Sequence, residues 1–235
     1  TCPNGALSTM TSSDSITWTG TFTPSSSTSD DSNTCDVGTG YTDDAGNTGV
    51  AGQSANYKVD TIAPSVNSIS FNDAAMKSGD TPTLTIVFSE AVAGFASADD
   101  VSCPNGALAN MASGDSITWT GTFTPTADTE DDTNVCTVAT SYTDTLGNSG
   151  GGATSANYAV ETLKPTATIA MSTSNSNSGF AKSGDTITLT VTMSESVTGL
   201  VCTIDGEATT MGGSGTSWTS ALTLSGDETE QNTVF

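Results

Sequence analysis

Acidic side chains and cysteines are the residues of this chain whose types and spacing could do chemistry. There are 26 Asp and Glu against 4 Lys and Arg, with no His, so the formal net charge is −22. Carboxylates gathered in loops, with Asn side chains and backbone carbonyls beside them, are the hard oxygen ligands that Ca²⁺ takes in sets of about six to eight. The 5 cysteines could form disulfides or stay as thiols. Cation binding and covalent cross-linking are therefore the chemistry to look for.

The same composition excludes several classes of function. A chain without Arg and almost without Lys cannot neutralise the phosphates of nucleic acid or the headgroups of anionic lipids. Without His, the side chain best suited to acid–base catalysis at neutral pH is missing. Pairs such as Asp115 and Ser116 lack the base that a catalytic triad needs. We therefore expect no enzyme activity, no nucleic-acid partner and, since no apolar run could span a bilayer, no membrane insertion in this segment.

The elements that position these residues are repeated along the chain. Residues 1–24 return as residues 102–125 with 19 of 24 positions identical, at an offset of 101 from Cys2 to Cys103. A more diverged third copy follows Pro165, where Lys182-Ser-Gly-Asp185 matches Lys77-Ser-Gly-Asp80. We predict the C-terminal part of one repeat in residues 1–60, a complete repeat in 61–161 and the N-terminal part of a third in 162–235. The chain is then expected to be a window onto a longer tandem array.

Period-2 patterning predicts that each repeat is all-β. Apolar residues alternate with threonine over residues 117–123 and again over residues 186–193, and no helical periodicity is found. Gly, Asn, Asp and Ser clusters separate these runs at strand-length intervals. About seven strands in a repeat of about 101 residues predict tandem immunoglobulin-like Greek-key β-sandwiches.

Cysteine spacing predicts one disulfide in each repeat. Cys2 and Cys35 are 33 residues apart, and so are Cys103 and Cys136. Such bridges need an oxidising compartment and would contribute roughly 3–4 kcal/mol by closing a loop of this length; paired free thiols are the alternative. Aligned on the tryptophans, the partner of Cys202 would fall at Phe235, so we expect that partner just beyond the window, or a slipped register, or an intermolecular bridge.

Several motifs resemble the bacterial Ig-like repeats of giant surface adhesins. They are Val59-Asp-Thr-Ile-Ala-Pro-Ser-Val66 at the junction, Ile86-Val-Phe-Ser-Glu-Ala-Val92, and the late loops Tyr142-Thr-Asp-Thr-Leu-Gly-Asn148 and Asp44-Ala-Gly-Asn47. Similar arrays occur in algal surface and flagellar-hair proteins. The resemblance implies an Ig-like fold and a spacer role at the cell surface.

Sandwich topology predicts where the acids gather. The linker, the loop after the second strand and the late loop should share one pole, and the loop at residues 128–132 should lie at the other pole. Stacked modules would then collect carboxylates at each junction, where calcium could make the array rigid; solvated surface acids are the alternative. The candidate calcium ligands are Asp60, Glu90, Asp144, Asn148, Asp128, Glu130, Asp131, Asp132, Glu161 and Glu195.

The function expected from these features is structural. We expect a stiff tandem Ig-like array that forms a stalk or filament segment of a large extracellular or cell-surface protein. Its partners would be neighbouring repeats of the same chain and, in a filament, identical chains. The alternative is an adhesion module that binds carbohydrate or a protein directly, which an exposed aromatic patch found in only one repeat would favour. The many Ser and Thr residues leave O-glycosylation open, for instance at residues 25–28.

Overall fold

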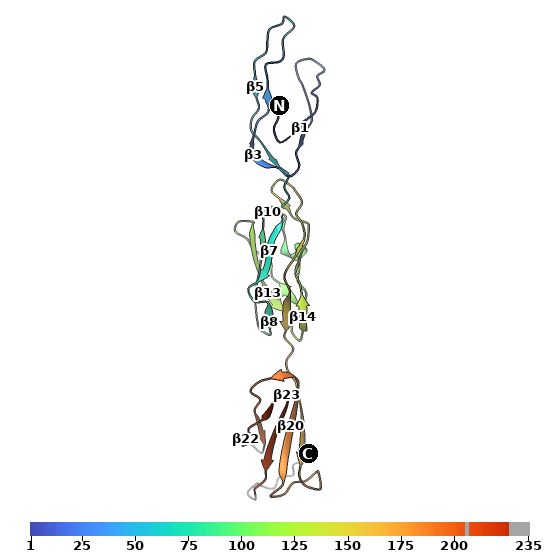
Figure 1. Ribbon diagram of the computed structural model, residues 1–235, viewed down its shortest axis with the longest axis vertical. Coiled ribbons are helices and arrows are strands. Elements are labelled where there is room, and N and C mark those ends of the chain that lie inside the picture. Colours follow the sequence, from blue (N-terminus) through green and yellow to red (C-terminus); the bar gives the residue numbers. More distant parts are fainter. Residues whose placement is uncertain (205–206, 226–235) are drawn as a thin grey trace. The chain divides into compact units, whose positions relative to one another are not determined.

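The protein forms two compact units in a computed structural model that describes residues 1–204 and 207–225. The first unit spans Thr1–Thr162 and the second spans Leu163–Phe235. The first unit holds the strands of residues 1–60 and, after them, a sandwich built from residues 61–162 (Figure 1).

The sandwich has two layers of strands, with β7 in one layer and β14 in the other (Figure 1), and its strand pairs are antiparallel except for the parallel pair β18 and β8. One layer has the strand order β12-β13-β9-β7, and alternate residues of β9 (Leu84, Ile86 and Phe88) are buried while their neighbours are not. The other layer contains the order β14-β18-β8, with β11-β15-β17 and β10-β16 as further short sheets. The immunoglobulin-like all-β prediction is thus confirmed. The elements are β7 (Val66–Phe71), β8 (Ala75–Lys77), β9 (Thr83–Phe88), β10 (Val92–Ala93), α1 (Ser97–Asp100), β11 (Val101–Ser102), β12 (Gly106–Leu108), β13 (Thr118–Pro125), β14 (Glu130–Asn134), β15 (Thr137–Val138), β16 (Thr143–Asp144), β17 (Ala153–Thr154) and β18 (Tyr158–Glu161).

The core of the sandwich is built around aromatic rings. Phe88 and Tyr142 meet edge to face at 4.8 Å between ring centroids, and Phe123 and Tyr158 meet in the same way at 5.7 Å. Each tyrosine hydroxyl donates to a backbone carbonyl, so the rings can be buried without leaving a polar group unsatisfied. A Cβ on Gly150 would lie 2.1 Å from the Tyr142 ring, which explains why glycine stands there.

Residues 1–60 repeat the late strands of the sandwich. Gly5–Leu7 pairs with Phe22–Pro24 in the same register as Gly106–Leu108 with Pro125–Phe123. The disulfides Cys2–Cys35 and Cys103–Cys136 are both present, as their spacing predicted. The elements are β1 (Gly5–Leu7), β2 (Phe22–Pro24), β3 (Ser29–Asn33), β4 (Asp36–Val37), β5 (Gly52–Gln53) and β6 (Tyr57–Asp60).

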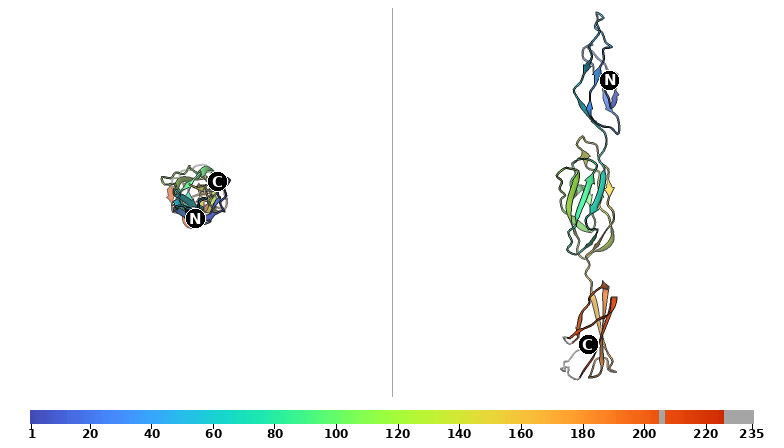
Figure 2. Two further views of the ribbon diagram at one scale, coloured as in Figure 1. Left: turned by 90° about the horizontal axis from the view of Figure 1, so that it is seen from above. Right: turned by 60° about the vertical axis from the view of Figure 1, so that its left-hand side comes forward.

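The second unit is a three-stranded antiparallel sheet and a hairpin. Its long strands β20 and β23 run side by side, with Val191 opposite Trp218, as Ile86 is opposite Trp119 in the sandwich (Figure 2). Cys202 packs against the small core of this unit, and position 235, where its partner was expected, lies outside the described residues. The elements are β19 (Ala167–Thr173), β20 (Thr186–Val197), β21 (Cys202–Ile204), β22 (Glu207–Thr209) and β23 (Gly212–Thr223).

Two local expectations were wrong. The acidic segment predicted as a loop is strand from Glu130 onward, because β14 pairs with β18 and that pairing overrides the poor β propensity of its sequence. A single helical turn, α1, follows β10 although no helical periodicity marks it. The Asp100 carboxylate holds this turn by accepting from the Ala96 amide at 2.7 Å.

Candidate metal centre

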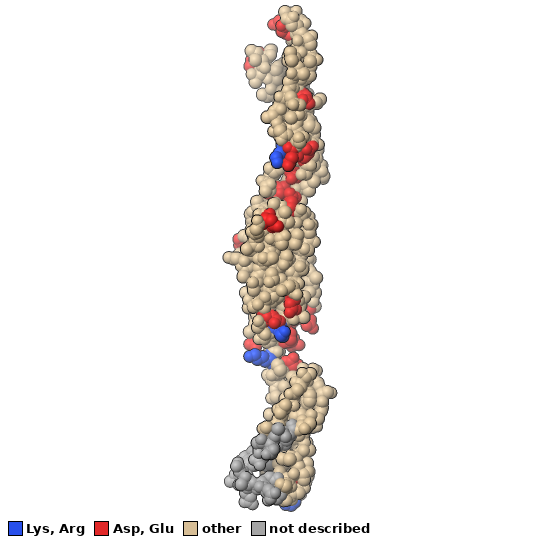
Figure 3. Space-filling model, turned by 90° about the vertical axis from the view of Figure 1, so that its left-hand side faces the viewer, with Lys and Arg blue, Asp and Glu red and all other residues tan. Residues whose placement is uncertain are grey.

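Three carboxylates meet at one end of the sandwich. Asp60 ends β6, Glu90 follows β9, and Asp144 ends β16. One oxygen of each lies within 4.8 Å of the others, and the Asp144 side chain is buried. On the face shown in Figure 3, acids gather near the ends of the sandwich and leave the flank between them largely uncharged. In the part of the chain that the structure describes, no second group of three Asp, Glu, His or Cys residues lies this close together.

A tight turn holds Asp144 in place. Its Oδ1 accepts from the amides of Leu146 and Asn148 at 2.8 and 2.9 Å, and its Oδ2 accepts from Asn148 Nδ2 at 2.6 Å. Gly147 supports the turn with a φ of 96°, a conformation that costs glycine little. The carboxylate is therefore fixed by its own loop before any ion arrives.

The same turn recurs in residues 1–60, where Asp43 rather than Asp44 makes the contacts. Asp43 Oδ1 accepts from the Ala45 and Asn47 amides at 3.0 and 2.8 Å, and Asn47 Nδ2 donates to Asp43 Oδ2 at 2.8 Å. The offset of 101 relates Asp43 to Asp144 and Asn47 to Asn148. The first acid of the motif is thus the one that organises the loop.

Electrostatics divides the three carboxylates into different roles. Burial, and then the negative charges of Asp60 and Asp144, raise the pKa of Glu90. Burial also pushes the pKa of Asp144 upward, but hydrogen bonds from Asn148, Leu146 and Gly147 outweigh it, so this pKa is lowered. Asp144 therefore stays ionised, whereas ionisation of Glu90 costs free energy because of its burial and the repulsion from Asp60 and Asp144. A cation would relieve that cost.

The linker between residues 1–60 and the sandwich is hydrogen-bonded on both sides. On the upstream side, Thr61 Oγ1 donates to the Ser25 carbonyl at 2.8 Å and accepts from the Thr28 amide at 3.0 Å. On the downstream side, Asn148 Nδ2 donates to the Asp60 carbonyl at 3.0 Å. The Gly151 amide also donates to the Pro64 carbonyl at 3.3 Å. Hydrogen bonds from side chains and from the backbone thus fix the linker to the residues on both sides of it.

The threonine of this joint was not singled out by sequence reasoning. Its counterpart Thr162 makes the same bonds, donating to the Thr126 carbonyl at 2.6 Å and accepting from the Thr129 amide at 3.0 Å. The available signal was the occurrence of an acid followed by threonine at both junctions, Asp60-Thr61 and Glu161-Thr162.

The predicted ligands of the other junction were expected at the opposite pole of the sandwich. Glu130 is paired across the strands with Glu161, which lies next to Lys77 on β8. Asp131 has its oxygens occupied by the Thr133 amide at 2.9 Å and by Asn105 Nδ2 at 2.8 Å, which explains its lowered pKa.

The remaining acids are spread over both units. Asp128 and Asp132 are exposed, and Asp128 takes a φ of 54° in the turn before β14. Glu195 lies on β20 in the second unit. The expected gathering of Glu195 with the acids of the sandwich stays a prediction.

Comparison with known proteins identifies the domain type. A family model described as bacterial Ig-like domain matches residues 1–59 and again residues 60–160. The chain belongs to the bacterial Ig-like domain family. Domains of this family are generally non-catalytic and often lie outside the cell or on its surface. Neither a curated protein nor a solved structure gave a match.

No helix in residues 1–204 and 207–225 combines the length and the apolar character needed to cross a bilayer.

Proposed function

We propose that these bacterial Ig-like domains form a segment of a stiff tandem array in an extracellular or cell-surface protein of the giant-adhesin type, acting as a stalk or as part of a filament rather than as an enzyme. The two-sided hydrogen bonding of the linker carries this proposal. Thr61 ties the linker to the strands before it, and Asn148 and Gly151 tie it to the sandwich after it. A joint with bonds on both sides resists bending more than a bare chain does. The two disulfides suit an oxidising location outside the cell.

Loss of the linker bonds tests the structural role. Thr61→Val keeps the size and β-branching of the side chain and removes the hydroxyl that bonds Ser25 and Thr28. Small-angle scattering should report a wider distribution of interdomain distances for this variant. Thr11→Val, an exposed threonine elsewhere in residues 1–60, is the matched control. An equal distribution for Thr61→Val and the unmodified chain would contradict a stiffness set by the linker.

We further propose that calcium binds the junction formed by Asp60, Glu90 and Asp144. Three carboxylates within 4.8 Å supply hard oxygens, and neighbouring backbone carbonyls and water could complete the set that Ca²⁺ prefers. Terbium luminescence with calcium competition, using Trp fluorescence as the donor, is the direct assay. Glu90→Gln should weaken binding at least about tenfold, whereas Glu130→Gln, outside the cluster, should not. Absence of binding at millimolar calcium would refute the site.

Stalk and filament differ in how whole molecules associate. Negative-stain microscopy of native material should show isolated threads for a stalk and ordered polymers of identical chains for a filament. In either case the neighbouring repeats of the same chain are the first partners of each module.

A further inference from the structure

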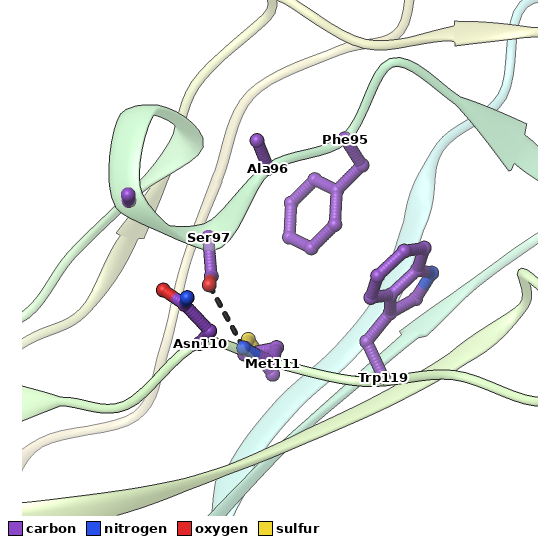
Figure 4. A pocket seen from close by; sticks show the side chains of 7 residues that line it. Phe95, Ala96, Ser97, Asn110, Met111 and Trp119 are labelled. Carbon is purple, nitrogen blue, oxygen red and sulfur yellow. Dashed lines mark hydrogen bonds between the residues drawn. The ribbon is translucent and has the colours of Figure 1, made fainter.

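The sandwich contains a cavity that is unrelated to the acidic junction. Its volume is about 300 Å³, and it opens between the segment that leads into α1 and the start of β13 (Figure 4). Phe95, Met111 and Trp119 form its apolar wall, and Ser97 and Asn110 lie at its polar side. Ala96 and Ala98 complete the lining. No charged side chain lines the cavity, although the chain as a whole carries −22.

The walls of this cavity are fixed in place. The Phe95 and Trp119 rings meet edge to face with centroids 5.0 Å apart. Ser97 Oγ accepts from the Met111 amide at 2.9 Å, which ties α1 to the connection between β12 and β13 (Figure 4). Asp100 is buried, and its carboxylate accepts from the Ala96 amide and from the Ser141 hydroxyl. A cavity with such walls exists before any ligand enters it.

Among its described residues, the second unit lacks the segment that forms this cavity. Where the sandwich has Phe95 to Asp100, the second unit passes from β20 to β21 through only Thr198–Val201. There Leu200 packs against the small core, as Trp218 does. The indole environments differ as well, since Trp218 Nε1 donates to the Gly215 carbonyl at 3.0 Å, whereas buried Trp119 Nε1 has no partner among the described residues. A spacer role predicts identical faces in every repeat, so a feature that the second unit lacks calls for a separate function.

We propose that this cavity binds a neutral sugar unit of a glycan. Its walls combine aromatic rings with a hydroxyl and an amide, which is how pockets orient a ligand that has apolar and polar faces. The Ser97 hydroxyl accepts from Met111 and so keeps its own proton for a ligand oxygen, while the Asn110 amide offers both a donor and an acceptor. The negative charge of the chain repels acidic sugars and phosphates. The Trp119 nitrogen points away from the Phe95 ring, so the indole contributes its carbon surface rather than its donor (Figure 4).

This inference goes beyond the structural role proposed above and stands on different residues. A single sugar in a pocket at the small end of the range for ligand sites should bind with a Kd on the order of 1 mM. Only further repeats that carry the segment from Phe95 to Ala98 would raise the overall affinity through multivalency.

The test uses the complete 235-residue chain and NMR. The probes are the methyl glycosides of glucose, galactose, mannose and N-acetylglucosamine, with a capped Leu-Phe dipeptide as the alternative ligand. At least one glycoside should shift the Trp119 indole signal, assigned with Trp119→Phe, and leave the Trp218 signal unchanged. Ala98→Leu places a larger side chain at an exposed helical position of the lining and should weaken binding at least about tenfold. Asn110→Ala should weaken it about fivefold.

Ala107→Leu is the matched control. Ala107 is an exposed alanine of β12, the strand that pairs with β13, and it does not line the cavity. It should bind like the unmodified chain. The proposal is overturned if no glycoside shifts Trp119 at about 20 mM, twenty times the expected Kd, if only the dipeptide does, or if Ala107→Leu and Ala98→Leu bind equally well. None of these outcomes bears on linker stiffness or calcium, which have their own assays.

Discussion

Asn148→Ala should destabilise the sandwich, because the Asn148 side chain bonds both the linker and the acidic loop. Asn148 Nδ2 donates at once to the Asp60 carbonyl at 3.0 Å and to Asp144 Oδ2 at 2.6 Å. The first bond is neutral and is worth about 1 kcal/mol, while the bond to the ionised carboxylate is worth about 1.5–3 kcal/mol. Asn148 is half-buried, so water can replace part of the loss. We expect a net cost of about 2–3 kcal/mol in the free energy of unfolding.

Native-state hydrogen exchange of the Ile86 and Val160 amides measures this cost within the full chain. Both residues belong to the core of the sandwich, so their amides report its opening rather than that of other modules. Asn47→Ala is the control, because Asn47 Nδ2 bonds only the exposed Asp43 in residues 1–60. It should leave both amides unchanged. Equal effects of the two variants, or a loss below about 0.5 kcal/mol for Asn148→Ala, would show that this side chain does not stabilise the junction.

Three further predictions concern polar side chains of the sandwich. The pKa of Glu90 is raised in the folded state, so its protonated form favours folding. The stability from this group is therefore present at acid pH and is lost as the pH rises through the raised pKa. Urea titrations without calcium at pH 5 and pH 7 should show this loss in the unmodified chain and not in Glu90→Gln. Burial, and then the charge of Asp131, raise the pKa of Tyr158 to about 12. Absorbance at 295 nm should therefore show a tyrosine that ionises at a pH well above the ordinary pKa of 10.0, and Tyr158→Phe should remove that step. Asn134-Val135-Cys136 has the rare N-x-C form of the N-glycosylation sequon. Asn134 is 2 % exposed and donates to the Asp131 and Tyr158 carbonyls, so mass spectrometry of native material should find no glycan there.

The sequence was sufficient wherever one physical signal dominated. Alternation of apolar residues and threonine identified the strand around Trp119, because a sheet with one buried face imposes that period. Equal cysteine spacing in two copies identified both disulfides. Topology alone placed Asp60, Glu90 and Asp144 at one pole, and the structure puts their oxygens within 4.8 Å of one another.

The rest depends on contacts that no local pattern records. The strand β14 is acidic and irregular, and only its pairing with β18 makes it a strand. The helical turn α1 exists because the buried Asp100 closes it, and a four-residue turn is too short to show periodicity. The cavity beside Trp119 follows from that turn, so it could not be foreseen from the tryptophan motif that all three repeats share.

The disulfide limits how far a module can extend under force. A sandwich of roughly one hundred residues would release about 350 Å of extended chain if it unravelled completely, at about 3.5 Å per residue. Cys103–Cys136 closes a loop of 33 residues that cannot be drawn out while the bond persists. The bond therefore withholds about 115 Å, which is about a third of the length of the extended chain. Pulled from its ends, the module with its disulfide intact extends to about 235 Å and then stops, and further load passes to the next domain.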